Sequence, residues 1–334
     1  MKKSILFLLI LSFAGAMLFA GGKSETGSAA APKTDFPKRP VEMVIPFGAG
    51  GASDIFARQY AQLAEKYLGK PITAINKGGA GTVEGMTYAY NAPADGYTIL
   101  EITPSLLIKE ALKASPISFR ENFEPLLKVQ ADVQLIGVAA KSPFKTFEEL
   151  RAFAKENPKK LKIGGLSPGG LDDYIQSGFA SAAGIEWTYV PYKSGSEIKA
   201  AVLGGELDVY QDKLISFLPL VASGDIRPLV VLNDTRLAQV AEIKELPCSV
   251  ELGINFTQGS WRGFAIKKGV PADVKVILID ALQKAYEDPG YKAMEEKAMT
   301  NIKPGYAKAD EYAKMWDAEY EGYVQIFKKS GLIK

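Results

Sequence analysis

Short apolar stretches alternate with longer amphipathic stretches along nearly the whole chain beyond residue 40. Apolar residues within 52–68 recur at helical spacing, and Gly69 follows where a left-handed helix cap is expected. This alternation predicts an α/β fold with parallel sheets joined by right-handed helical crossovers. The first run of the pattern consists of the expected strands 41–47, 71–77 and 97–103 and the expected helices 52–68 and 82–92.

A second run of the same pattern begins after Val138. With 334 residues the chain is long enough for two domains of ordinary size, so we expect two lobes, each with a sheet rich in parallel strands. We place the first lobe at 36–136 and 259–334 and the second at 137–258. The later elements that we expect are helices at 147–157, 172–184, 196–205, 272–288, 291–299 and 309–331 and strands at 161–165, 187–192, 206–212, 226–233 and 263–269.

The residue types that the chain lacks exclude several classes of enzyme. It has no histidine, which excludes Ser-His-Asp and Cys-His nucleophiles and every metal site that needs imidazole. Its single cysteine, Cys248, cannot form an internal disulfide or a thiolate cluster. The 40 basic and 38 acidic residues give a net charge of +2, and loss of Lys2 and Lys3 with the leader would make the mature chain neutral. Most familiar hydrolase and oxidoreductase mechanisms are thereby excluded, so we expect that the protein is not an enzyme of those kinds and has no cofactor, no metal and no nucleic-acid partner.

The first 20 residues have the order of a secretory signal peptide. Lys2 and Lys3 precede an apolar run that ends in small residues, so we expect cleavage near Ala20. The run 5–20 is shorter than the ~20 residues of a membrane span. No cysteine follows it, so no lipid anchor is expected. Residues 21–35 are small and polar and predict a disordered leader. The signal peptide predicts that the protein is exported.

Three glycine-rich segments stand between an expected strand and an expected helix. Pro46 to Asp54 reads PFGAGGASD, 164–171 reads GGLSPGGL and 78–82 reads GGAGT. Glycine lets a ligand approach backbone N–H groups closely, and a helix start adds partial positive charge, so such loops favour an anion. The dinucleotide and phosphate-loop patterns are both absent from the sequence. The alternative is that these glycines only make tight turns.

Further polar residues follow the expected strands. The hydroxyls of Thr103 and Ser105 would either bond a ligand or cap a helix. Asp172 and Asp173 would either face a ligand or complement the start of a helix. Arg262 would pair with a carboxylate through two parallel hydrogen bonds. If the two lobes face each other, a ligand in the cleft would touch loops from both.

Five segments in order carry a resemblance to a known family: VIPFGAGGASDIFAR, NKGGAGTVEG, ADGYTIL, VPYKSGSEIKAAVLGGELDVYQD and GDIRPLVVL. The succession resembles the periplasmic solute-binding proteins of tripartite tricarboxylate transporters, the TctC-like or Bug family. The resemblance spans nearly all of the chain beyond residue 36. It implies a two-lobed periplasmic binding protein, similar to the type II Venus flytrap, with a ligand cleft between the lobes. It also implies a receptor that closes on a small organic carboxylate and delivers it to a membrane permease.

The family's first carboxylate site matches 47–54, and its opposing loop matches 164–173. In relatives the opposing loop commonly carries hydroxyls and a histidine, whereas this chain has Leu166, Gly170 and Asp173 there. Fewer donors and more negative charge disfavour citrate and favour a monocarboxylate, a dicarboxylate or an amino-acid-like ligand. The candidate ligand-binding residues are Phe47, Gly48, Ala49, Gly50, Gly51, Ser53, Asp54, Gly81, Thr103, Ser105, Ser167, Gly169, Gly170, Asp172, Asp173, Tyr192 and Asp212.

Two other functions stay open on the sequence alone. A liganded receptor of this kind would also suit a membrane histidine kinase, as its sensor subunit. Asp172, Asp173 and Asp212 would be the acid/base carboxylates of a hydrolase, although adjacent aspartates on one helix point in different directions and make a poor pair. We expect a monomer.

Overall fold

The computed structural model describes residues 34–166 and 168–334, and residues 34–334 form one unit. The expected signal peptide at 1–20, most of the expected leader at 21–35 and Ser167 lie outside the described residues. In the part of the chain that is described, no helix combines the length and the apolar character that crossing a membrane requires.

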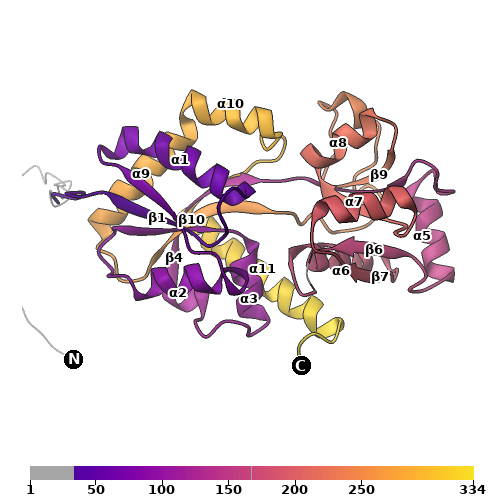
Figure 1. Ribbon diagram of the computed structural model, residues 1–334, viewed down its shortest axis with the longest axis horizontal. Coiled ribbons are helices and arrows are strands. Elements are labelled where there is room, and N and C mark those ends of the chain that lie inside the picture. Colours follow the sequence, from indigo (N-terminus) through magenta and orange to yellow (C-terminus); the bar gives the residue numbers. More distant parts are fainter. Residues whose placement is uncertain (1–33, 167) are drawn as a thin grey trace, which may run out of the picture. The chain divides into compact units, whose positions relative to one another are not determined.

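A six-stranded sheet, here called the large sheet, is built from the beginning and the end of the chain (Figure 1). The first three strands pair in parallel, β1 lying between β2 and β3. The strand β10 lies between β3 and β4 and is antiparallel to both, and β11 pairs antiparallel with β4 at the edge. The strands are β1 (Val41–Ile45), β2 (Ile72–Asn76), β3 (Thr98–Ile102), β4 (Phe123–Ala131), β10 (Trp261–Lys267) and β11 (Tyr306–Lys308).

Helices cover both faces of the large sheet (Figure 1). Side chains alternate along β1, so that Met43 enters one apolar core and Val44 the other. The Met43 core is covered by α1 (Ala52–Leu68), α9 (Ala272–Glu287) and α10 (Pro289–Ala298). The Val44 core is covered by η1 (Ala80–Thr82), α2 (Val83–Asn91), α3 (Pro104–Ala111), α4 (Phe119–Asn122) and α11 (Ala309–Lys329).

The middle of the chain forms two small sheets. In the three-stranded sheet β5 lies between β8 and β9 and is antiparallel to both. In the two-stranded sheet β6 and β7 are parallel, and Ile163 of β6 forms a bridge with Val209, just before β8. These elements are β5 (Gln134–Ala139), α5 (Phe147–Glu156), β6 (Lys162–Gly165), α6 (Leu171–Ala183), β7 (Thr188–Pro191), α7 (Gly195–Gly204), β8 (Tyr210–Lys213), α8 (Leu214–Ala222), β9 (Ile226–Leu232) and η2 (Ala241–Ile243).

The α/β class expected from the sequence is confirmed, but the sheets are mixed and not mainly parallel. Two of the parallel pairs, β1-β2 and β6-β7, are joined directly by a helix, α1 and α6 respectively. The chain passes from β4 to β5 through Asp132 and Val133 and comes back into the large sheet at β10. Because β10 enters between β3 and β4 in the opposite direction, this return makes the large sheet mixed.

Candidate functional site

A cavity of about 500 Å³, here called the loop cavity, lies where the ends of β1 and β3 meet the start of α6. It is lined by residues of the large-sheet part and of the small-sheet part. Many of them were expected from the sequence: Phe47, Gly48, Gly51, Ser53, Gly81, Thr103, Ser105, Gly169, Gly170 and Asp172.

The loop before α1 presents an open helix start to this cavity. Gly50 takes a left-handed conformation (φ 78°), and the extended Gly51 precedes the helix without any side-chain cap. The Asp54 carboxylate accepts a hydrogen bond from the Gly50 N–H at 2.9 Å and pairs with the Arg58 guanidinium at 2.8 Å. The Gly50 N–H holds the pKa of Asp54 below its usual value, and Asn76 and Arg58 add to this effect. Asp54 therefore holds the loop and is not one of the residues that line the cavity.

The loop before α6 repeats this arrangement. Gly169 is left-handed (φ 67°), and the extended Gly170 precedes the helix with no side-chain cap. The Asp173 carboxylate accepts the Gly169 N–H at 2.8 Å and the Ser177 hydroxyl at 2.9 Å. Like Asp54, it is turned toward its own loop. The start of α1, in the large-sheet part, and the start of α6, in the small-sheet part, thus face the same cavity. Each helix start carries partial positive charge.

Asp172 is the acidic residue in the lining of the loop cavity. It is half-buried, and its Oδ2 accepts the Leu166 N–H at 3.2 Å. Burial raises the pKa of Asp172, and the negative charges of Asp212 and Asp173 raise it further. Asp172 also lines a neighbouring cavity of about 160 Å³, which Asp212 lines as well. There Asp212 accepts the Tyr210 hydroxyl and the Lys213 N–H, both at 2.7 Å.

The start of α3 supplies hydroxyls. Thr103 is the N-cap of α3, where its Oγ1 accepts the Ser105 N–H at 3.4 Å, and both residues line the cavity. Helix capping and cavity lining are therefore combined in Thr103. Gly81 and Thr82 close the wall beside α2, and both have positive φ.

Three cations line the cavity: Lys109, Lys213 and Arg262. The two lysines were not among the residues expected from the sequence, and Arg262 was considered as a carboxylate partner without being placed in the site. The Arg262 guanidinium donates to Gln130 Oε1 at 2.7 Å and lies 3.8 Å from Glu101 Oε1. The sequence contained one indication for Lys213, which directly follows Asp212 at the end of a strand.

The remaining expected residues lie outside the lining of the loop cavity. Ala49 and Gly50 are exposed in the first loop. Tyr192 is packed against the apolar core of the small sheets. Ser167 is not among the described residues. Within 34–166 and 168–334, no group of three or more acidic or cysteine side chains is placed to hold a metal ion.

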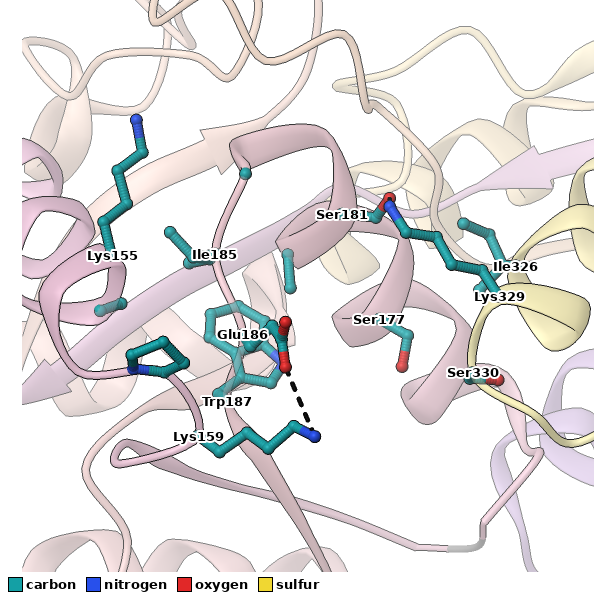
Figure 2. Close-up of a pocket in the computed structure, with 14 residues that line it drawn as sticks. Lys155, Lys159, Ser177, Ser181, Ile185, Glu186, Trp187, Ile326, Lys329 and Ser330 are labelled. Carbon is teal, nitrogen blue, oxygen red and sulfur yellow. Dashed lines mark hydrogen bonds and ion pairs between the residues drawn. The ribbon is translucent and has the colours of Figure 1, made fainter.

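A larger cavity of about 760 Å³, here called the lysine groove, lies at the other end of α6 (Figure 2). Lys329 donates to the Ser181 hydroxyl at 2.7 Å, and Lys159 pairs with Glu186 at 3.6 Å. Because the C-terminal end of a helix carries partial negative charge, these lysines complement α6 itself. The loop cavity, with two helix starts, is the better candidate for an anionic ligand despite its smaller volume.

Comparison with known proteins places the chain among solute receptors. The model of the tripartite tricarboxylate transporter family receptor, TctC, matches residues 56–332. A Cupriavidus necator protein, "UPF0065 protein in gbd 5'region", is 32% identical over 307 residues, which cover 90% of each chain. Protein BugT of Bordetella pertussis is 26% identical over 300 residues, 89% of this chain and 90% of its own.

Solved structures agree in fold. A TctC solute binding protein from Polaromonas superposes with a TM-score of 0.77 at 23% identity, covering 88% of this chain and 99% of its own. The periplasmic binding protein BugD superposes with a TM-score of 0.68 at 26% identity, covering 89% and 99%. The resemblance and the periplasmic binding protein fold expected from the sequence are thereby confirmed. The chain belongs to the tripartite tricarboxylate transporter receptor family, TctC, whose members are periplasmic solute-binding receptors and not enzymes.

Proposed function

We propose that this receptor binds a small organic acid in the loop cavity and delivers it to a tripartite tricarboxylate-type membrane permease. The observation that carries the proposal is the meeting of two uncapped helix starts, those of α1 and α6, at one cavity. Backbone N–H groups at both starts, with Arg262 and Lys213 in the same wall, match the charge of a carboxylate.

The first carboxylate of the ligand is proposed to lie against the loop 47–53. The donors there are backbone N–H groups and the Ser53 hydroxyl, and the cation beside them is Arg262. The rest of the ligand extends toward Gly169, Gly170 and Asp172.

The size of the cavity and two structural relatives support a small acid. A volume of about 500 Å³ is in the range of small-molecule sites. R. palustris Rpa4515 was solved with adipate and superposes with a TM-score of 0.71 at 23% identity. MatC from Rhodopseudomonas palustris was solved with malate and superposes with a TM-score of 0.67 at 21% identity. Both named ligands are dicarboxylic acids.

We propose that the two parts of the chain are lobes that close on the ligand, as expected at 36–136 with 259–334 and at 137–258, but with the first boundary at Asp132, because β5 (Gln134–Ala139) belongs to the small sheets. The crossing segments would act as the hinge, with Asp132 in one and Ser260 in the other, joined by the Asp132 N–H to Ser260 O bond at 2.8 Å. A ligand that touches both helix starts binds the closed form better and so shifts the population toward it. The permease would then recognise the closed receptor.

The export of the receptor follows the expectation from its first residues. Cleavage near Ala20 without a lipid anchor would release the mature chain into the periplasm. Its neutral charge gives little long-range attraction for an anion, so selectivity would come from the donors in the cavity.

Isothermal titration calorimetry with a panel of acids tests the proposal. The panel is adipate, succinate, malate, glutamate, 6-aminohexanoate and citrate, each with the mature chain. We expect at least one acid to bind with a Kd near ~1 μM, equivalent to about −8 kcal/mol. Small-angle scattering should show a more compact particle with that acid than without it. If no acid of the panel binds, the proposal is wrong.

A further inference from the structure

Glu101 is a completely buried carboxylate directly behind the loop cavity. It lies on β3, and its exposed fraction is 0%. Among the described residues, its one hydrogen-bonding neighbour is the Ser53 hydroxyl, which lies 3.5 Å from Arg262 Nε. Its nearest cation is Arg262, whose Nε lies 3.8 Å from Glu101 Oε1 and which also lines the cavity. Burial of an ionised carboxylate with so few hydrogen bonds and no close ion pair is costly, so a functional role for Glu101 is worth considering.

The cations Arg262 and Lys213 are balanced by nearby carboxylates in the absence of a ligand. Both line the cavity, as does Lys109. Asp132 and Glu101 lie within 4.0 Å of Lys213 or Arg262, and Asp172 is the carboxylate of the lining itself. Lys213 Nζ lies 3.0 Å from Asp132 Oδ2, and Arg262 Nη1 lies 4.0 Å from the same oxygen.

An incoming carboxylate disturbs this balance. The ligand carboxylate beside Arg262 adds one negative charge at a place that is partly removed from water, where unpaired charge is costly. It also takes up part of the interaction of Arg262, the cation that faces Glu101. A proton on one carboxylate of the site would offset this charge, whereas the second carboxylate of a diacid lies at the other end of the cavity.

Glu101 is the carboxylate least able to remain ionised. Asp132 has Lys213 at 3.0 Å, and Asp172 accepts the Leu166 N–H at 3.2 Å. We propose that the loop cavity binds its organic acid together with one proton, and that Glu101 holds this proton. The inference rests on the proposed function, because it requires an acid in the cavity.

Among Glu101 and the charged or titratable groups that face it, Arg262 and Tyr312, Glu101 is the group expected to titrate near neutral pH. Burial raises the pKa of Glu101 to about 7, while the charge of Arg262 on β10 and the Ser53 hydroxyl on α1 oppose that rise. Tyr312 on α11 also interacts electrostatically with Glu101. Burial holds the pKa of Tyr312 well above 10.0, so the Tyr312 hydroxyl stays neutral. A ligand carboxylate beside Arg262 weakens this opposing influence and adds a negative charge near Glu101, so the bound state favours protonated Glu101.

This arrangement predicts a pH dependence with a defined sign. If Glu101 of the free receptor titrates near pH 7 and must be protonated before the acid binds, the affinity for the acid falls ~tenfold from pH 8 to pH 9. From pH 6 to pH 7 this affinity falls only ~twofold. An acid without an ammonium group, such as adipate, does not change its own charge between pH 7 and pH 9.

Calorimetry in buffers of different ionisation enthalpy measures the proton directly. The probe is adipate or, if adipate does not bind, the tightest ammonium-free acid of the panel, titrated at pH 8 in phosphate and in Tris. We expect close to one proton taken up per acid bound. Glu101→Gln should abolish both the proton uptake and the fall in affinity from pH 8 to pH 9. Asp172→Asn is the matched control, because Asp172 also has a raised pKa, and it should retain both effects.

The outcomes separate this inference from the proposed function. If the acid binds without proton uptake, the inference is wrong and the proposed function stands. The same holds if Asp172→Asn abolishes the proton uptake and Glu101→Gln retains it. If no acid binds, the proposed function fails and the inference fails with it. Should Glu101→Gln not fold, infrared difference spectra of wild type and Asp172→Asn decide. A protonated carboxyl C=O band must appear in both when the acid is added at pH 8, and its absence from either contradicts the role of Glu101.

Discussion

The loop before α1 and the loop before α6 share one backbone arrangement. Each has a left-handed glycine, then an extended glycine as N-cap, and then an aspartate in the first turn that accepts the N–H of the left-handed glycine. The two hydrogen bonds, Gly50 to Asp54 and Gly169 to Asp173, are 2.9 Å and 2.8 Å long. In both loops the aspartate holds the turn closed and the glycines leave the helix start open.

The loops differ at the residue before that aspartate. The first loop has Ser53, a neutral hydroxyl near Arg262, and the second has Asp172, a half-buried carboxylate. Because Asp172 would repel a second carboxylate, we propose that the two ends of the cavity select different chemistry. One end suits a carboxylate, and the other suits a hydrogen-bond donor or a protonated acid.

The largest effect is expected from Gly51→Val, which tests whether the first loop is more than a turn. Gly51 has φ −78° and ψ 171°, which valine adopts readily, and a Cβ there would meet only Gly48 O at 3.6 Å. The chain should fold, and the added isopropyl group would occupy the cavity wall. We expect acid binding at least ~100-fold weaker by calorimetry, equivalent to about 2.7 kcal/mol.

Gly204→Val is the matched control for this change. Gly204 lies at the end of α7, and a Cβ there would have no neighbouring atom within 4 Å. Its affinity for the acid should equal that of wild type. Unchanged affinity in Gly51→Val would show that the first loop only connects β1 to α1.

The next largest effect concerns the aspartates that hold the loops. Asp54→Asn loses the ion pair with Arg58 and weakens the acceptor for the Gly50 N–H, which should lower the free energy of unfolding by ~2 kcal/mol at pH 7. Asp173→Asn has no such ion pair to lose and should cost ~1 kcal/mol. Urea unfolding at pH 7 measures both, and equal losses would contradict the difference between the loops.

The pH dependence of Asp54→Asn has a defined sign. Since the pKa of Asp54 is below its usual 3.8 in the folded chain, its carboxylate stabilises the fold above that pH. This contribution is lost as the pH falls from 3.8 toward the lowered pKa. The stability difference between wild type and Asp54→Asn should therefore shrink when urea unfolding is repeated at pH 3.

Local features of the site could be predicted from the sequence, because they depend on neighbouring residues. The helix at Ala52–Leu68 follows from apolar spacing, and Gly69 caps it in the left-handed conformation (φ 73°) as expected. Both glycine loops stand at helix starts as expected. The role of Asp54 and Asp173 as acceptors for glycine N–H groups was not anticipated. A helix-start function was considered for Asp173, whereas Asp54 was expected only as a ligand-binding residue.

The charged wall of the cavity could not be predicted in the same way. Asp132, Lys213 and Arg262 come from three distant parts of the chain. Arg262 meets Asp132 because β10 pairs with β4, and Lys213 meets Asp132 because β8 pairs with β5. The alternation of strands and helices does not state which strands pair. The same limit applies to the mixed sheets, and to Glu101, which reads as one polar residue inside an apolar strand.

Asp172→Asn sharpens the comparison of the two loops at constant pH. Adipate has a carboxylate at each end, whereas 6-aminohexanoate has the same length with an ammonium at one end. Removing the charge of Asp172 should strengthen adipate binding ~tenfold and weaken 6-aminohexanoate binding ~tenfold, about 1.4 kcal/mol each. Citrate, with three carboxylates, should bind wild type more weakly than adipate does. If the affinities for adipate and 6-aminohexanoate change in parallel, Asp172 does not select the far end of the ligand.

The smallest effect is expected at the opposite end of α6, in the lysine groove. Lys329 is exposed and donates to the Ser181 hydroxyl at 2.7 Å, and both residues line that groove (Figure 2). An exposed lysine contributes little to stability, and the partial negative charge at this helix end does not attract an anion. Lys329→Ala should therefore change acid affinity by less than ~0.5 kcal/mol, or about twofold, in the same calorimetric assay. A larger loss would mean that both ends of α6 take part in ligand capture, and the difference between the loops would then explain only part of the selectivity.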